Sequence, residues 1–202
     1  MAEPALILAS ASPRRLDLLR QIGCEPRHLI AASLDETPLK GELPRAHAIR
    51  LAREKAEAVL AKREMIKFSG PFIVLAADTV VGVGRRILPK ADTESDARAC
   101  LSLLSGRAHR VHTAVVIAAA DGTRRLRHVE TRVGFKRLSL EETEAYIASG
   151  EWRGKAGGYA IQGLAAAYID FLSGSYSGVV GLPLYETAQL LGSVGIKAKG
   201  MS

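Results

Sequence analysis

Short apolar runs alternate along this chain with segments whose apolar residues recur at helical spacing. The first run, residues 5–9, predicts a buried strand. Ser12 then suits the N-cap of a helix, Pro13 suits its first turn, and Gly23 follows the last apolar residue of the stripe. The chain is therefore expected to open with a strand, a tight loop and a helix.

The remaining sequence continues this alternation. The expected elements, in order, are a helix (44–63), a strand (72–83), a helix (93–106), two strands (110–119 and 124–136), a helix (139–150), a strand (168–172) and a helix (183–191). Thr93 and Ser139 each begin a capping box, and the Asp121-Gly122 pair is a strong hairpin signal. Helices combined with a central hairpin favour an α/β fold, with a mixed β-sheet and flanking helices.

Composition narrows the class of protein. The chain has 202 residues, of which 48% are hydrophobic, so it can bury a substantial core. Aromatic residues make up 5%, which argues against a protein that stacks single-stranded bases. No apolar stretch reaches about 18 residues, and the N-terminus does not resemble a secretory signal. We therefore expect a soluble, cytoplasmic protein with no membrane partner.

The formal net charge is +7, which favours an anionic partner without identifying it. A basic stretch at residues 107–137 is the best candidate for nucleic-acid binding. It lacks interleaved aromatic residues and any recognisable binding motif, so a solvated hairpin face is the preferred interpretation and a basic nucleic-acid-binding regulator is the alternative.

The loop that precedes the first helix is the best local signal for chemistry. Free backbone N–H groups and the helix dipole favour a phosphate there. Arg14 and Arg15 oppose that dipole. They would be explained by bidentate pairing with phosphate, or they are two solvated surface charges, and the pattern leaves both interpretations open.

Asp78 lies in the most apolar run of the chain. An ionised carboxylate in that setting is costly unless it is paired or binds a cation. Placed at a strand end, Asp78 could hold a divalent metal or serve as a general base, whereas the alternative is an Asp that caps a turn. The apolar flanks favour the functional interpretation.

Four other polar residues give weaker signals. Lys55 lies on or beside the buried stripe of its expected helix, where position alone favours a side chain that extends to solvent. Lys90 is an ordinary loop lysine. Glu36 is one of two adjacent acids, which suit a turn unless a phosphate site nearby makes them ligands for Mg²⁺. Gln162 offers both a donor and an acceptor to a base edge, but a lone Gln is weak evidence.

Several motifs follow one another in a specific order along nearly the whole chain: Ser12-Pro13-Arg14-Arg15, Ala77-Asp78-Thr79, Lys155-Ala156-Gly157 and Ile161-Gln162-Gly163. Together they resemble the Maf family of nucleoside triphosphate pyrophosphatases. The resemblance implies one Maf/Ham1-like domain over residues 1–202, two-lobed with a central cleft. It also implies cleavage of a nucleoside triphosphate between the α and β phosphates, with Mg²⁺ or Mn²⁺ as cofactor.

The same resemblance implies substrates and residue roles. It favours dTTP and UTP, or modified pyrimidine nucleotides, with 7-methyl-GTP as the alternative, and a homodimer is possible. The implied catalytic residues are Asp78, Lys55, Lys90 and Glu36, the implied metal ligands are Asp78 and Glu36, and the implied substrate-binding residues are Ser10, Arg14, Arg15, Thr79 and Gln162. Asp78 would activate water, although which carboxylate is the base and which the ligand stays open.

Two positions depart from the family pattern. Pro89 replaces a usual glycine and is expected to re-aim the loop that carries Lys90, because proline restricts the residue before it. Gly154 replaces a usual acid, which removes any salt bridge or metal contact expected from that acid. Neither change removes Asp78, so we expect an active enzyme.

Overall fold

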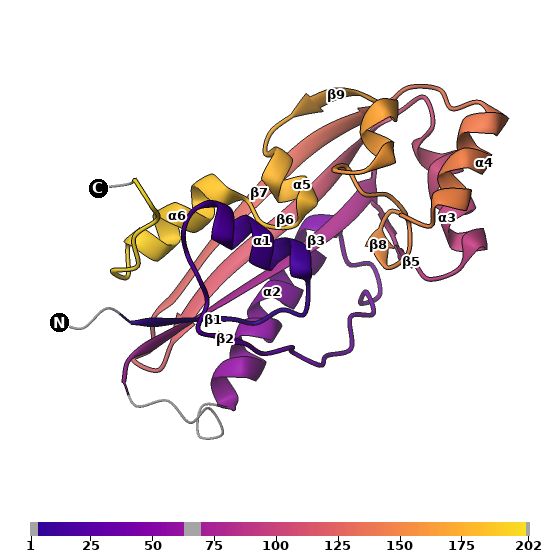
Figure 1. Cartoon of the computed structure of the whole chain (residues 1–202). Coiled ribbons are helices and arrows are strands. Elements are labelled where there is room, and N and C mark those ends of the chain that lie inside the picture. Colours follow the sequence, from indigo (N-terminus) through magenta and orange to yellow (C-terminus); the bar gives the residue numbers. More distant parts are fainter. Residues whose placement is uncertain (1–3, 63–69, 201–202) are drawn as a thin grey trace.

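The fold is built on a long mixed β-sheet, which the computed structural model describes for residues 4–62 and 70–200 (Figure 1). The order is β2-β1-β3-β6-β7-β9, and β4 pairs with β3. The strands are β1 (Ala5–Leu8), β2 (His28–Leu29), β3 (Phe72–Val83), β4 (Arg86–Leu88), β6 (Ala108–Ala119), β7 (Arg124–Phe135) and β9 (Ile169–Ser173). Only the β1 pairings, to β2 and β3, are parallel, so the sheet is mixed as expected.

Helices cover both faces of this sheet. The α-helices of the described residues are α1 (Pro13–Gln21), α2 (Pro44–Ala61), α3 (Glu94–Leu104), α4 (Leu140–Ser149), α5 (Tyr176–Val180) and α6 (Leu184–Gly192), of which α3 and α4 lie in a separate cluster at one end of the sheet (Figure 1). On one face, the buried alanines of α2 pack against Val74 and Ala76 of β3. On the other face, Leu19 of α1 and Leu191 of α6 pack against Leu75. The alternation of side chains along β3 thus separates two apolar cores.

A second cluster of elements packs at the far end of β6 and β7. It contains α3, α4 and a two-stranded ribbon of β5 (Lys90–Ala91) and β8 (Lys155–Ala156) (Figure 1). Its core includes Leu104, Tyr146 and Trp152. The ribbon matters for function because it holds Lys90 and Lys155 on adjacent strands.

Most of the expected elements are present. The strand predicted over 72–83 has those bounds, and the capping boxes that start α3 and α4 both form. The helix expected over 44–63 extends to Ala61, and its expected last residue, Arg63, lies outside the described residues. Ser12 occupies the N-cap of α1 but makes no capping bond with its side chain. The short strands β2, β4, β5 and β8, the helix α5 and a 3-10 helix at Leu164–Tyr168 are additional, and Lys90, expected in a loop, lies on β5.

Part of the basic hairpin is neutralised within the chain. Arg110 pairs with Glu130 of the adjacent strand at 2.9 Å. Arg124 reaches Glu57 of α2, and Lys136 reaches Glu142 of α4. These pairs favour a solvated hairpin face over a nucleic-acid surface. Among the described residues, no helix has both the length and the apolarity to span a membrane.

Candidate active site

The candidate site opens where β1 ends beside β3. The parallel pairing stops at Leu8 and Leu75, and the chain then turns into the loop that leads to α1. The longer strand β3 continues along β6 and pairs Asp78 with Ala114. The expectation that Asp78 lies at a strand end is therefore wrong. Asp78 is mid-strand, and the opening beside it exists because the neighbouring strand is short.

Asp78 forms a buried ion-pair cluster with residues from two other segments. The Lys55 ammonium of α2 lies 2.5 Å from Asp78 Oδ1 and 2.6 Å from Glu36 Oε1. Lys55 is 6% exposed and Asp78 is 5% exposed. The position-based interpretation of Lys55 as a solvent-seeking side chain is therefore wrong. Its positive charge instead offsets the desolvation cost of the buried Asp78 carboxylate.

Glu36 links this cluster to the β5–β8 ribbon. Its second carboxylate oxygen accepts a hydrogen bond from Lys90. Partial burial opposes ionisation of Glu36, but the hydrogen bonds from Lys55 and Lys90 prevail and hold its pKa down to about 2. Its neighbour Asp35 instead accepts from the backbone N–H of Thr37 in an exposed turn. Of the two adjacent acids, only Glu36 reaches the site.

The two arginines of the first helical turn differ in their contacts. Arg15 donates from Nε to the Gly181 carbonyl at 2.9 Å and from Nη1 to Ser10 Oγ at 3.2 Å. Arg14 lines the cleft, and no residue in the described ranges forms a hydrogen bond or ion pair with it. Partial burial lowers the pKa of Arg14. An unpaired guanidinium at a helix N-terminus is a ready partner for an anion.

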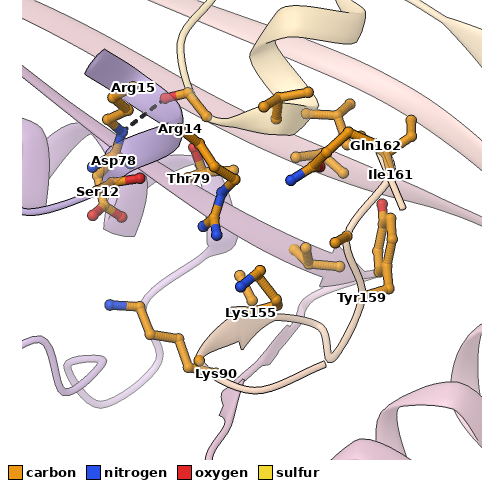
Figure 2. Close-up of a pocket in the computed structure, with 18 of the residues that line it drawn as sticks. Ser12, Arg14, Arg15, Asp78, Thr79, Lys90, Lys155, Tyr159, Ile161 and Gln162 are labelled. Carbon is orange, nitrogen blue, oxygen red and sulfur yellow. Dashed lines mark hydrogen bonds between the residues drawn. The ribbon is translucent and has the colours of Figure 1, made fainter. Parts of the chain in front are cut away.

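The cleft itself has a volume of about 250 Å³ and lies between α1, β3 and the glycine-rich segment after β8. Thr79 and Gln162 line it, together with Lys155, which the sequence motifs contained but to which we assigned no role. Figure 2 shows Arg14 and Lys155 directing their charged ends toward the same part of the cleft, with Gln162 nearby. Proximity to Arg14, after burial, lowers the pKa of Lys155.

The two departures from the family pattern meet in one ribbon. The Pro89 carbonyl accepts from Gly157 N–H at 2.9 Å, and Gly154 N–H donates to the Ala91 carbonyl at 2.9 Å. Leu88 before the proline is already in an extended strand, which is the conformation that proline favours there. Gly154 has a φ of 63°, a left-handed conformation that glycine adopts without strain. The ribbon therefore accommodates both residues and still directs Lys90 to Glu36.

The donor set suits a hard divalent cation. Asp78 and Glu36 lie close together, since both carboxylates contact the same Lys55 nitrogen. That ammonium occupies the point between them, so a cation would bind beside it, through carboxylate lone pairs that Lys55 leaves free. Mg²⁺ commonly binds through one or two carboxylates, with water and phosphate oxygens completing its coordination. Within the described ranges, no group of three or more His, Cys, Asp or Glu residues could hold a metal alone. The protein contribution thus fits a cation that arrives with a phosphate-bearing ligand.

Paired carboxylates beside a cleft that is lined by several cations are typical of an α/β protein that acts on phosphate-bearing substrates. The family described as Maf-like protein matches residues 5–194. A dTTP/UTP pyrophosphatase of Caulobacter vibrioides is 61% identical over 196 residues, covering 97% of this chain and 98% of the relative. One of Novosphingobium aromaticivorans is 59% identical over 196 residues, covering 97% and 94%. The chain belongs to the Maf family, which confirms the resemblance seen in its motifs.

More distant similarity extends to solved structures. A HAM1 protein from Coxiella burnetii has a TM-score of 0.43 at 16% identity, covering 67% of this chain and 74% of that one.

Proposed function

We propose that this protein hydrolyses dTTP and UTP between the α and β phosphates, giving a nucleoside monophosphate and pyrophosphate. The observation that carries the proposal is the buried Lys55–Asp78 ion pair, which shares one cleft with Arg14 and which the half-buried Glu36 contacts through Lys55. Relatives about as long as this chain are named dTTP/UTP pyrophosphatases, which supports the substrate assignment.

The positions of the charges suggest how the triphosphate is held. Arg14, Lys90 and Lys155 line the cleft and offer positive charge to the phosphate oxygens. Arg15 is tied to Gly181 and Ser10, so it fixes the shape of the loop and adds charge behind it. Phosphoryl transfer depends on this positioning and neutralisation more than on covalent chemistry.

Asp78 is the proposed proton acceptor. Lys55 lies 2.5 Å from its Oδ1, which orients the carboxylate and leaves Oδ2 to accept a proton from the attacking water. Asp78 and Glu36 would hold the divalent cation, which supplies charge neutralisation at the phosphates when bound. Thr79 and Gln162 lie farther along the cleft and are proposed to contact the base.

The test is pyrophosphate release from a panel of canonical and modified nucleoside triphosphates in the presence of Mg²⁺. We expect dTTP and UTP to be cleaved fastest, with pyrophosphate rather than phosphate as product. A faster reaction with 7-methyl-GTP would replace the base assignment but keep the chemistry. Tight, steeply salt-dependent binding of duplex DNA or RNA without any pyrophosphate release would favour the nucleic-acid-binding alternative.

Asp78→Asn tests the mechanism within that assay. The variant should lose at least about 100-fold in kcat, a typical loss when a general base is removed. Asp35→Asn is the matched control, because Asp35 is an exposed acid one residue from Glu36 and outside the cluster. Full activity in a folded Asp78→Asn variant would rule out Asp78 as the base.

A further inference from the structure

Glu36 belongs to a segment without helix or strand, residues 31–41, which lies in the connection between β2 and α2. Figure 1 shows this connection as a long coil that leads from β2 to the start of α2. Residues 37–41 are exposed, and the Leu39 side chain is 60% exposed. A cavity of about 360 Å³, lined by Glu36 and Asp78 among others, adjoins the segment. Apolar packing therefore does little to hold the part of the segment that follows Glu36.

Hydrogen bonds to Glu42 and Arg50 hold this segment instead. The Leu39 N–H donates to Glu42 Oε2 at 3.0 Å, and Arg50 Nη2 donates to the Thr37 carbonyl at 3.2 Å. In the described part of the chain, every hydrogen bond between the main chain of the segment and a residue outside it runs to Glu42 or Arg50. The segment is therefore tied to α2 through these two side chains.

Glu42 and Arg50 form a largely buried ion pair with two parallel hydrogen bonds. Arg50 donates from Nε to Glu42 Oε1 at 2.8 Å and from Nη2 to Glu42 Oε2 at 2.9 Å, which is the bidentate geometry that fixes orientation. The Glu42 side chain is 7% exposed and that of Arg50 is 21% exposed. Hydrogen bonds from Arg50 hold the pKa of Glu42 down to about 2. The pair is thus charged and rigid, and it can act as a clamp on the segment.

The same helix carries both the clamp and a member of the buried cluster, because Arg50 and Lys55 both belong to α2. The Lys55 ammonium lies 2.6 Å from Glu36 Oε1. We propose that Glu42 is a positioning residue: it holds the Glu36 carboxylate beside Asp78 and thereby sets the affinity of the site for its divalent cation. The inference rests on the proposed function, in which Asp78 and Glu36 hold that cation.

The primary test replaces Glu42 by alanine, which removes both acceptor oxygens. The probe is Mn²⁺, whose binding is followed by electron paramagnetic resonance together with a UTP analogue that has a methylene bridge between the α and β phosphorus atoms. Mn²⁺ affinity should fall about tenfold, the usual size of loss when a residue that supports metal ligands is removed. The Mg²⁺ concentration for half-maximal pyrophosphate release should rise by a similar factor.

Glu42→Gln is the second variant, and it decides the matter if Glu42→Ala does not fold. Glutamine keeps the shape but has one acceptor oxygen and a donor in place of the other, so it cannot complete the bidentate pair with Arg50. Mn²⁺ affinity should fall in the same direction by a smaller factor.

Glu54→Ala is the matched control. Glu54 pairs with the same Arg50 at 3.1 Å, but its side chain is 43% exposed, and none of its hydrogen bonds to described residues reaches the segment. Mn²⁺ affinity should not change in this variant. Hydrogen exchange of the Leu39 amide, measured without metal or nucleotide, should be faster in Glu42→Ala and unchanged in Glu54→Ala, because only Glu42 accepts from that amide.

A double variant separates positioning from general damage. In a Glu36→Gln background, Glu42→Ala should weaken Mn²⁺ binding no further, because Glu42 acts through Glu36. Wild-type Mn²⁺ affinity in the Glu42 variants, an equal loss in Glu54→Ala, or a full additional loss in the Glu36→Gln background would overturn the role of Glu42 and leave the proposed function intact. Absence of pyrophosphate release from UTP and dTTP by the wild-type protein would overturn the proposed function and this inference with it.

Discussion

Replacing Lys55 by methionine tests the buried cluster most directly. Methionine nearly matches the length of lysine but removes the charge that lies 2.5 Å from Asp78 and 2.6 Å from Glu36. Asp78 would keep a carboxylate with a 7% exposed side chain and, among the described residues, no ion-pair partner, with Arg15 left as the nearby cation. Breaking a buried pair on one side costs about 3–5 kcal/mol, so Lys55→Met should lower the free energy of unfolding by that amount.

Lys90→Met is the matched control, because Lys90 contacts the same Glu36 from a side chain that is 51% exposed. An exposed pair contributes about 0–1 kcal/mol, so the two methionine variants should differ by about 3 kcal/mol. That difference isolates the contribution of Asp78. Urea denaturation at pH 7 would measure it as a shift in midpoint at constant slope.

A double variant adds an internal check. Once Asp78 is changed to Asn, the Lys55 ammonium is the group left unpaired, and removing both charges together should cost less than the sum of the single changes. A Lys55→Met variant within about 1 kcal/mol of wild type, or one no less stable than Lys90→Met, would refute the view that Lys55 stabilises a buried Asp78.

Two other predictions concern the first helical turn and a buried histidine. Arg14→Ala should raise the KM for UTP about tenfold or more while changing the free energy of unfolding by less than about 0.5 kcal/mol, because Arg14 has no partner among the described residues. Arg15→Ala should also lower the free energy of unfolding by about 1.5–3 kcal/mol, because Arg15 loses its bonds to Gly181 and Ser10. Steady-state kinetics and urea melts would check both variants, and equal stability of the two would contradict the assignment. His109 is 3% exposed, and burial lowers its pKa to about 4, so the unfolded chain binds a proton below about pH 6.5 that the folded chain refuses. Stability should therefore fall by up to about 3 kcal/mol as the pH drops from about 6.5 to about 4, and should fall less in His109→Phe; equal losses in both proteins would contradict this origin.

Local sequence signals were sufficient wherever neighbouring residues decide the structure. The bounds of β3 follow from a long, mainly apolar run that only Asp78, Thr79 and Gly82 interrupt, and the starts of α3 and α4 follow from capping boxes that close within four residues. The helix α5 gave no such signal, because Tyr176–Val180 is only five residues long and contains a glycine. Its Gly178 carbonyl accepts a hydrogen bond from the hydroxyl of Thr113, 65 residues away, which is a contact that no local pattern indicates.

In the candidate site, too, some features follow from local sequence and others depend on contacts between distant segments. Asp78 was predictable because a carboxylate in an apolar run requires a partner. The identity of that partner was not predictable, since Lys55 lies 23 residues earlier on another element and resembles any lysine at the margin of a helical stripe. Glu36 resembled a turn residue because its partners, Lys55 and Lys90, also lie far from it in the sequence. The strand pairings that bring these side chains together are set by the whole sheet, so no local pattern contains them.

The charge of the assembled site accounts for part of the basic surplus. Asp78 and Glu36 are balanced by Lys55 and Lys90, with which they pair directly. Arg14, Arg15 and Lys155 add three further positive charges around the same cleft. A surplus of cations that cannot neutralise one another is unfavourable in a partly buried space, and an anion with several charges relieves it. A triphosphate fits this arrangement better than a single phosphate does, because it carries more negative charge to set against Arg14, Arg15 and Lys155.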